Sequence, residues 1–277
     1  MASDAAPRRT IVDQTGYRAS YVERPERIVS LVPSQTELLF NLGLADRLVA
    51  CTRYCLHPAE ARERLTVIGG TKRLDVAAVI ALAPDLVIGN KEENDKETIE
   101  ALRAASPTWL SDIADMPTAL AMIESIGELC GAQHAATDLA ARISERWASL
   151  PDGGGRSVAY LIWRKPFMAV GTDTFIDDVL VRLNWRNVFA DRSRYPQTSA
   201  EELAKLAPDL TLLSSEPYPF TATHVAELEE AVGVGRTVLV DGEMFSWYGS
   251  RLLTAPDYFD ALMASIDLPR PHAGRPS

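Results

Sequence analysis

The chain has 277 residues, 47% of them hydrophobic and 24% charged, which is the balance of an ordinary globular protein. Its formal net charge of -10 excludes a non-specific nucleic-acid binder, because phosphate binding needs a clustered positive surface. Three cysteines, an odd number without framework spacing, do not predict a fold held together by disulfides.

Strands and helices are predicted to alternate in the first part of the chain. RIVSLVP is a short apolar run that ends at a proline and predicts a strand. Ser34 and Glu37 form a capping-box pattern, so we expect a helix from Ser34 to about Gly43. Further strands are expected at residues 47–51, 85–89 and 108–110, and helices at 74–82 and 95–105. This alternation favours a parallel sheet covered by helices.

Residues 117–150 carry apolar positions at helical spacing and show no strand pattern. Gly131 should divide this stretch into two helices or kink one helix, and Pro-Asp-Gly-Gly-Gly ends it at residue 155. The alternation then begins again. Strands are expected at 157–163, 209–214 and 237–240, and helices at 175–183, 200–206, 223–232 and 255–266.

LAPDL occurs twice, at residues 82–86 and 206–210, about 50 residues after the first strand of each half. In both copies the proline should end a helix and Asp-Leu should enter a strand. Two copies are too few for a solenoid. The sequence therefore predicts an α/β fold of two lobes with parallel sheets, namely residues 1–130 and 153–277, joined by a long helix at 131–152.

Ligands of open α/β sheets bind at the carboxyl ends of the strands. The segments that follow the predicted strands are rich in aromatic rings, which suit a large and partly apolar ligand. The NKEEN segment is charged, whereas SSEPYPF is aromatic. The predicted ligand-binding residues are Ser34, Tyr54, Asn90, Lys91, Glu92, Trp163, Arg164, Tyr195, Glu216, Tyr218, Phe245, Trp247, Tyr248 and Arg251.

Signatures of enzymes and metal sites are missing. GxSxG, the P-loop, GxGxxG and HExxH do not occur, and no two histidines are spaced as a metal pair. Cys51 and Cys55 in CTRYC are interpreted as small residues packed near a strand end. We expect no catalytic residue and no metal ligand.

RIVSLVPSQTELLFNLG and GGTKRLDVAAVIALAPDLVIGNKEEN, followed by the long helix, resemble the class of periplasmic binding proteins with a helical backbone. SRYPQTSAEELAKLAPDL and FSWYGSRLL fall where those proteins place their cleft loops. The resemblance extends from about residue 27 to residue 267 and is nearest to the cobalamin-binding members. The class also serves haem and ferric-siderophore importers.

The resemblance implies two Rossmann-like lobes, a rigid helix between them and a metal chelate in the cleft. Cobalamin or another corrinoid is the expected chelate, and a ferric siderophore or haem is the second choice. No covalent cofactor is expected. Lys91, Arg164 and Arg251 would meet carboxylate or phosphate groups on its periphery. Positions that match cleft-facing places of the family are Tyr54, Lys91, Tyr195, Trp247 and Arg251. Where cobalamin binders have an aromatic residue after the DLVI strand, this chain has Asn-Lys-Glu at 90–92, which indicates a more polar ligand.

The resemblance also implies a membrane partner, the permease of an ABC importer. In members that bind importers, each lobe presents one acidic residue to the membrane partner. Glu201 lies at the matching position of the second lobe. Asp75 is the acidic residue closest to the matching position of the first lobe. We expect a monomer and no nucleic-acid partner.

The first 33 residues contain no apolar stretch of roughly 7–15 residues behind a basic start, so no signal peptide is expected. No transmembrane helix is expected either. These observations predict a cytoplasmic protein, or a periplasmic one if a presequence is missing. The alternative function is a cytoplasmic enzyme or carrier that acts on a chelate, with Glu92 and Glu216 as acid/base candidates.

Overall fold

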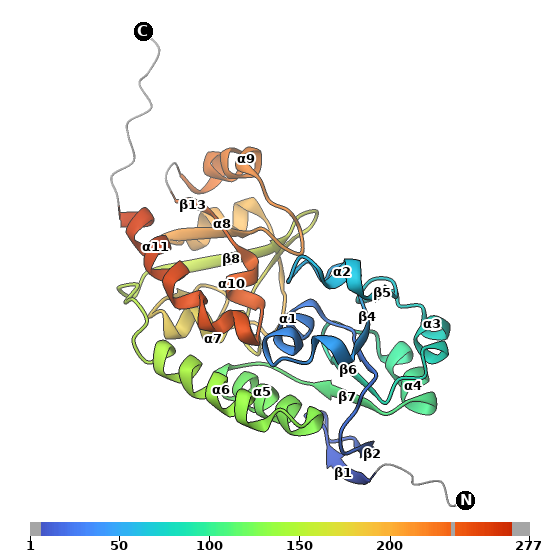
Figure 1. Ribbon diagram of the computed structural model, residues 1–277. Helices are drawn as coiled ribbons and strands as arrows, with labels where there is room; N and C mark the ends of the chain where they lie inside the picture. Colours follow the sequence, from blue (N-terminus) through green and yellow to red (C-terminus); the bar gives the residue numbers. More distant parts are fainter. Residues whose placement is uncertain (1–6, 234–235, 268–277) are drawn as a thin grey trace, which may run out of the picture. The chain divides into compact units, whose positions relative to one another are not determined.

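The computed structural model describes residues 7–233 and 236–267 (Figure 1). The chain is an α/β protein whose contacts divide it into two units. Unit 1 comprises Met1–Ile113, Pro117–Ser144 and Tyr248–Leu253, and unit 2 comprises Ala114–Met116, Glu145–Trp247 and Thr254–Ser277. The chain therefore passes between the units several times, unlike the predicted division into three consecutive segments.

Unit 1 contains a five-stranded, fully parallel sheet with the strand order β5-β4-β3-β6-β7. Its core combines buried Val29 and Val87 of the central strands, and Leu31 directly after β3, with Leu102 of helix α4. The strands are β3 (Ile28–Ser30), β4 (Leu48–Cys51), β5 (Thr66–Val67), β6 (Leu86–Asn90) and β7 (Thr108–Ser111). The helices that lie wholly or mostly in unit 1 are α1 (Pro33–Asn41), η1 (Ala45–Arg47), α2 (Ala61–Arg64), α3 (Val76–Ala81), α4 (Lys96–Ala105), α5 (Met116–Cys130), α6 (Gln133–Trp147) and η2 (Ser250–Leu253).

Helix α1 begins one residue earlier than predicted, and the predicted capping box is wrong. Val32 is the N-cap residue and Pro33 opens the helix, without a side-chain cap. Proline favours the first helical position because its fixed φ suits the helix and it has no N–H to satisfy. Ser34 thus lies inside the first turn, where it is 4% exposed.

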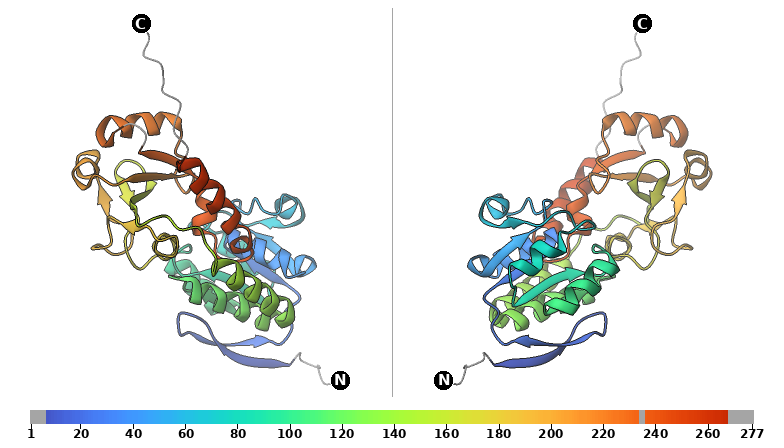
Figure 2. Two further views of the ribbon diagram at one scale, coloured as in Figure 1. Left: turned by 90° about the vertical axis from the view of Figure 1, so that its left-hand side faces the viewer. Right: turned by 90° about the vertical axis from the view of Figure 1, so that its right-hand side faces the viewer.

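Helices α5 and α6 are separate, which is one of the two arrangements expected at Gly131. Gly131 adopts a φ of +68°, a left-handed conformation that ends α5. The two helices lie side by side (green in Figure 2). A Cβ on Gly127 would come within 2.2 Å of the Ala136 Cβ, so glycine permits their close approach.

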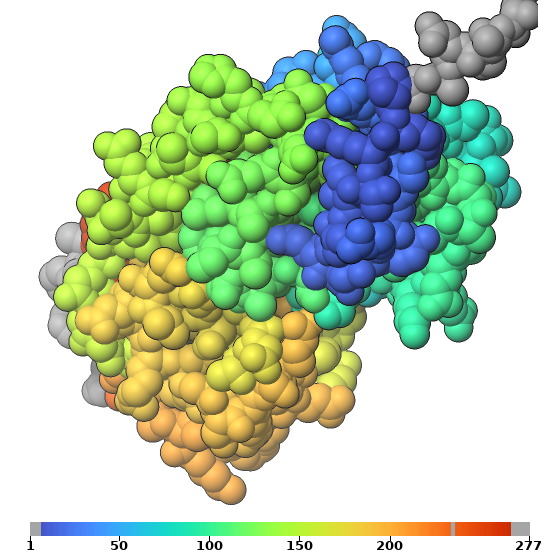
Figure 3. Space-filling model, turned by 90° about the horizontal axis from the view of Figure 1, so that it is seen from below, coloured from blue at the N-terminus to red at the C-terminus, as the bar shows by residue number. Residues whose placement is uncertain are grey.

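An antiparallel hairpin, β1 (Arg8–Val12) and β2 (Arg18–Val22), precedes the sheet of unit 1 and was not predicted. Figure 3 shows it in dark blue against the green helix α5, where Arg9 pairs with Glu128. Asp13 follows β1 and accepts hydrogen bonds from the backbone N–H groups of Thr15 and Tyr17, each at 2.9 Å. The Asp13 bonds close the turn of the hairpin, and the Arg9–Glu128 pair attaches it to α5.

Unit 2 contains a six-stranded sheet with the order β11-β9-β8-β12-β13, in which β10 also pairs with β8. The strands β10, β8, β12 and β13 run parallel, whereas β9 and β11 pair antiparallel. The strands are β8 (Ser157–Trp163), β9 (Phe167–Ala169), β10 (Arg186–Asn187), β11 (Gln197–Thr198), β12 (Leu210–Ser214) and β13 (Thr237–Val240). The helices are α7 (Phe175–Arg182), α8 (Ala200–Leu206), α9 (Ala222–Val232), α10 (Gly242–Ser246) and α11 (Ala255–Asp267).

The two LAPDL copies leave their helices through the same left-handed turn at alanine. Ala83 and Ala207 have φ values of 46° and 43°, so each alanine turns the chain out of a helix in a left-handed conformation. The proline that follows is buried in both copies, and the next strand, β6 or β12, is buried along its whole length. This confirms that each copy ends a helix and enters a strand.

Within the part of the chain that the structure describes, no helix has the length and apolar character needed to span a bilayer.

Candidate functional site

The carboxyl ends of neighbouring strands in unit 1 meet at one edge, because β4, β3 and β6 are adjacent and parallel. Three polar segments lie at these strand ends. They are the first turn of α1 after β3, residues 52–55 after β4, and residues 90–94, which begin with the last residue of β6. Gln35, in the first of them, donates from Nε2 to the Gly89 carbonyl at 3.2 Å and to the Ser111 Oγ at 2.7 Å. It thereby attaches α1 to β6 and β7.

Asn90 shapes the turn that follows β6. Its Oδ1 accepts from the backbone N–H groups of Glu92 and Glu93 at 2.8 and 3.0 Å, and its Nδ2 donates to the Ser111 Oγ at 2.9 Å. The residue is 1% exposed. The Asn90 amide is therefore already used in hydrogen bonds within the protein. It fixes the turn on which Lys91 and Glu92 lie.

Lys91 and Glu92 lie at the surface of this turn. The Lys91 ammonium pairs with the Asp112 carboxylate. The backbone carbonyl of Glu92 accepts from the Lys72 Nζ at 2.6 Å. The loop thus presents charges of both signs at the end of β6.

Tyr54 is the exposed aromatic ring of unit 1 at these strand ends, with 53% exposure. A Cβ on Gly70 would lie 3.0 Å from the Tyr54 Cε2, so the ring rests against the glycine backbone. The absence of a side chain at Gly70 allows this position.

In unit 2, Trp163 ends β8 and is 41% exposed. Its ring packs edge-on against Tyr218 with centroids 5.7 Å apart. The Tyr218 hydroxyl lies 3.2 Å from the His224 Nε2. Because the His224 Nδ1 accepts from the Thr221 backbone N–H at 2.9 Å, Nε2 carries the proton of the neutral ring and donates to Tyr218.

Arg164 follows Trp163, and its guanidinium meets both carboxylate oxygens of Glu227, at 2.7 and 2.6 Å. This pair raises the pKa of Arg164 and lowers that of Glu227. The charge of Arg164 is therefore already neutralised by an acid.

Glu216 and Trp247 form a hydrogen-bonded pair. The Glu216 Oε1 accepts from the Trp247 Nε1 at 2.9 Å and from the Ser246 Oγ at 2.8 Å. Burial raises the pKa of Glu216, and the two hydrogen bonds oppose this shift. Trp247 is 7% exposed, so most of its ring is covered.

Phe245 belongs to the core of unit 2. It is fully buried and lies 5.1 Å from the Tyr160 ring and 5.0 Å from the Phe259 ring, measured between centroids. Tyr248 is also buried, whereas Tyr195 is half-buried and lies below the Arg194 guanidinium at 5.6 Å. The structure thus separates Phe245 from the exposed rings with which the sequence grouped it.

Arg251 in η2 forms a two-point ion pair with Glu37 of α1. Its Nε and Nη2 lie 3.1 and 2.7 Å from the two carboxylate oxygens. The side chains are only 12% and 16% exposed. Arg251 therefore holds η2 to α1 within unit 1, a role that sequence reasoning missed.

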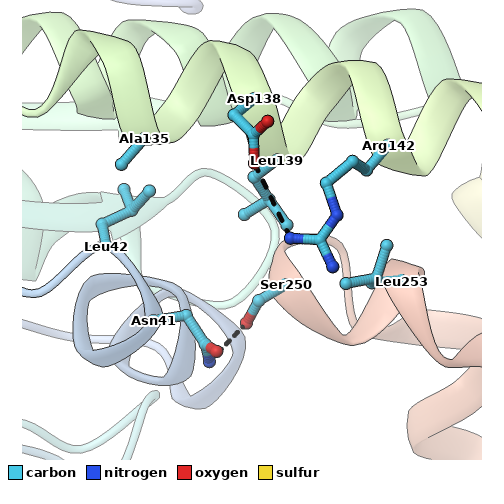
Figure 4. A pocket seen from close by; sticks show the side chains of 8 residues that line it. All are labelled: Asn41, Leu42, Ala135, Asp138, Leu139, Arg142, Ser250 and Leu253. Carbon is cyan, nitrogen blue, oxygen red and sulfur yellow. Dashed lines mark hydrogen bonds and ion pairs between the residues drawn. The ribbon is translucent and has the colours of Figure 1, made fainter.

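A pocket of about 300 Å³ lies elsewhere on unit 1, at the end of α1 opposite Ser34 (Figure 4). Asn41 donates to the Ser250 Oγ at 3.0 Å, and Asp138 pairs with Arg142 at 3.7 Å. The remaining walls are Leu42, Ala135, Leu139 and Leu253. The strand-end rule could not find this pocket. Among the described residues, no group of three or more His, Cys, Asp or Glu side chains could hold a metal ion.

The family model of the periplasmic binding proteins matches residues 28–234, about three quarters of the chain. The chain belongs to this family. The match includes both LAPDL copies and the strands that carry the exposed rings.

Two relatives of this binding protein align with most of its chain. An uncharacterized ABC transporter substrate-binding lipoprotein of Bacillus subtilis is 30% identical over 212 residues, covering 72% of this chain and 67% of the relative. The vitamin B12-binding protein of Yersinia pseudotuberculosis is 24% identical over 273 residues, 95% of each chain.

Solved structures show the same fold. The periplasmic vitamin B12-binding protein of Vibrio cholerae has a TM-score of 0.73 at 22% identity, covering 88% of this chain and 99% of that one. The petrobactin-binding protein of Bacillus subtilis has a TM-score of 0.80 at 15% identity, covering 95% and 100%.

These matches confirm the predicted family, the α/β fold with parallel sheets and the assignment as a binding protein rather than an enzyme. The predicted cytoplasmic location is wrong. The relatives are lipoproteins or periplasmic proteins, and the absence of a visible signal peptide was not a sound basis for that prediction.

Proposed function

We propose that this periplasmic binding protein captures a metal chelate of the corrinoid class outside the cytoplasmic membrane and delivers it to an ABC importer. The observation that carries the proposal is the exposed Trp163 ring at the end of β8, supported edge-on by Tyr218. A relative named as a vitamin B12-binding protein aligns with 95% of the chain, which supports the ligand class.

Exposed aromatic rings at strand ends favour a ligand with broad apolar faces. Trp163 in unit 2 and Tyr54 in unit 1 are 41% and 53% exposed, whereas most large rings of this chain are buried. A ring that remains exposed can bury its surface against a ligand, and aromatic residues contribute strongly to such contacts.

Polar groups at the end of β6 suit a chelate with a polar periphery. Lys91 and Glu92 lie beside one another on the turn after this strand. Corrinoids carry amides and a phosphate on their periphery, so they can accept from Lys91 and donate to Glu92. Ferric siderophores and haem, which carry hard oxygen ligands or carboxylates, are the second choice. Arg164 and Arg251 are not part of this proposal, because Glu227 and Glu37 already pair with them.

Acidic residues at two helix N-termini support the importer as partner. Asp75 is the exposed N-cap of α3, and Glu201 is exposed in the first turn of α8. These are the helices that precede the two LAPDL copies. We assign docking to Glu201, with Asp75 as its counterpart. The Glu201→Lys variant should abolish uptake in cells, whereas Glu230→Lys, an exposed site on α9, should not.

The proposed ligand is tested by titrating the purified protein with cyanocobalamin, haemin and a ferric hydroxamate. Calorimetry and tryptophan fluorescence measure the affinity for each chelate. We expect cyanocobalamin to bind most tightly, and Trp163→Ala and Tyr54→Ala each to weaken binding roughly tenfold. Tyr17→Ala, which removes a ring on the β1–β2 hairpin that is 38% exposed, is the matched control. Tighter binding of another chelate, or unchanged affinity in both variants, would refute the proposal.

A further inference from the structure

The pocket formed by α1, α6 and η2 has room for a small molecule only. All of its lining residues belong to unit 1, and it lies away from the strand-end segments that carry the exposed rings. Its volume of about 300 Å³ is at the lower end of small-molecule pockets, which span roughly 300 to 1,000 Å³. Such a space suits a ligand of about ten non-hydrogen atoms. A chelate macrocycle has several times more, so any ligand of this pocket differs from the proposed chelate.

One wall of the pocket carries two opposite charges, Asp138 and Arg142, which lie one helical turn apart on α6. Their carboxylate and guanidinium are 3.7 Å apart, beyond hydrogen-bond distance, and more than half of each side chain is exposed. Exposed pairs of this kind contribute little to stability. Neither side chain has another polar partner among the described residues. Both charges are therefore available to a ligand.

The facing wall carries two neutral polar groups. Figure 4 shows Asn41 of α1 and Ser250 of η2 across the pocket from Asp138 and Arg142. The Asn41 Nδ2 donates to the Glu37 carbonyl at 2.9 Å and to the Ser250 Oγ at 3.0 Å. Within the described residues, nothing donates to the Asn41 Oδ1, and the Ser250 hydroxyl has no acceptor for its own proton. This wall therefore offers one acceptor and one donor.

Apolar side chains complete the lining. Leu42, Leu139 and Leu253 come from three different segments of unit 1, and Ala135 is the fourth apolar residue. An aliphatic group placed against these side chains would be removed from water, which favours binding. The pocket thus combines a cation, an anion, two neutral hydrogen-bonding groups and an apolar surface within one small space.

We propose that this pocket binds a small zwitterion with an aliphatic side chain, namely an apolar α-amino acid. The ligand carboxylate pairs with the Arg142 guanidinium and accepts from the Ser250 hydroxyl. The ligand ammonium pairs with the Asp138 carboxylate and donates to the Asn41 Oδ1. The aliphatic side chain lies against the leucines. A molecule with a single charge engages only one half of the polar groups.

Calorimetric titration of the full chain with L-leucine tests the proposal. We expect saturable binding at or below millimolar concentration. Isocaproate lacks the ammonium of leucine and isoamylamine lacks its carboxylate, whereas both keep the aliphatic part. We expect each of them to bind at least tenfold more weakly than L-leucine. Equal binding of either molecule, or no binding of L-leucine at millimolar concentration, would overturn the proposal.

Substitutions at the two charges locate the binding. Arg142→Gln and Asp138→Asn should each weaken L-leucine binding about tenfold. Lys96→Gln and Glu100→Gln are the matched controls, because they break an exposed ion pair of the same spacing and the same 3.7 Å length on α4. These controls should keep the wild-type affinity. Circular dichroism verifies that each variant is folded.

Wild-type affinity in the folded Arg142→Gln and Asp138→Asn variants would show that L-leucine binds elsewhere, and would refute the proposed site. No chelate is added in these titrations. Trp163→Ala, the variant that tests the proposed chelate function, should bind L-leucine as tightly as the wild type does. The two proposals can therefore fail independently of each other.

Discussion

Asp85 and Asp209 make the same connection in the two units. The Asp85 Oδ2 accepts from the backbone N–H groups of Glu26 and Arg27 at 2.9 and 3.0 Å, just before β3 begins. The Asp209 Oδ2 accepts from the backbone N–H and the hydroxyl of Ser157, both at 2.7 Å, where β8 begins. Each aspartate of the LAPDL repeat thus fixes the start of its own strand against the neighbouring parallel strand.

Removal of the Asp209 carboxylate should destabilise the protein. Asp209→Ala leaves the Ser157 backbone N–H and hydroxyl without their acceptor, and we expect the free energy of unfolding to fall by about 2 kcal/mol. Urea denaturation followed by circular dichroism measures it. Asp260→Ala, an exposed site on α11, should change it by less than about 0.5 kcal/mol. Equal effects of the two substitutions would show that the connection does not stabilise the fold.

Strand patterns predicted the longer parallel strands of both sheets, because buried parallel strands are short continuous apolar runs. The two-residue parallel strands β5 and β10 escaped prediction, and so did the antiparallel strands. β1 (RRTIV) alternates between exposed and half-buried residues, and its position depends on Arg9 reaching Glu128. β9 has three residues and pairs with β8 and β11. Such pairings depend on distant partners and leave little local signal.

The strand-end rule located the segments that bear Tyr54, Lys91 and Trp163, but it could not show which side chains are already engaged. Glu37 lies 214 positions before its partner Arg251, so no local pattern reveals their ion pair. Phe245 resembles the exposed rings in composition and is nevertheless fully buried. Exposure and pairing follow from tertiary packing, which a single sequence does not specify.

Arg251 should matter for stability more than for ligand binding. Arg251→Ala leaves the Glu37 carboxylate largely buried without its partner, and we expect the free energy of unfolding to fall by about 3 kcal/mol. Chelate affinity, measured by calorimetry on the folded protein, should remain within a few-fold of that of the wild type. A large loss of affinity with unchanged stability would instead support the family-based ligand role.

A double-mutant cycle separates the energy of the Arg251–Glu37 ion pair from the other contributions of the two side chains to stability. Glu37→Ala alone should also destabilise, whereas the double variant should lose less than the sum of the two single losses. The difference is the coupling energy of the ion pair, which we expect to be at least about 1 kcal/mol. Strict additivity would show that Arg251 and Glu37 do not stabilise each other.

Substitution by alanine should change the stability of the protein by different amounts at two adjacent glycines of the PDGGG segment. A Cβ on Gly153 would lie 2.2 Å from the Trp185 Nε1 and 2.6 Å from the Leu183 carbonyl oxygen. Gly154 has a φ of +70° and open space around it. We expect Gly153→Ala to cost about 3 kcal/mol by displacing the Trp185 ring, and Gly154→Ala about 1 kcal/mol by backbone strain alone. Urea denaturation gives both values, and the reverse order would contradict the packing at Gly153.

Glu216 should make stability depend on pH in a direction that its burial determines. Burial raises its pKa above the ordinary value of 4.5, so the folded protein retains a proton that the unfolded chain has already released. Between the ordinary and the raised pKa, folding takes up this proton. The contribution of Glu216 to the free energy of unfolding therefore decreases as the pH rises through that window.

The Glu216→Gln variant should remove this dependence while keeping the acceptor. A glutamine Oε1 can still accept from the Trp247 Nε1 and the Ser246 Oγ, which both bond to Oε1 of the glutamate. The stability of the variant relative to the wild type should therefore increase as the pH rises above about 4.5. Urea denaturation at several pH values measures the difference, with Glu230→Gln on the exposed face of α9 as control. If the difference stays constant with pH, the carboxyl group titrates normally, and the Trp247 indole is held by an ionised Glu216.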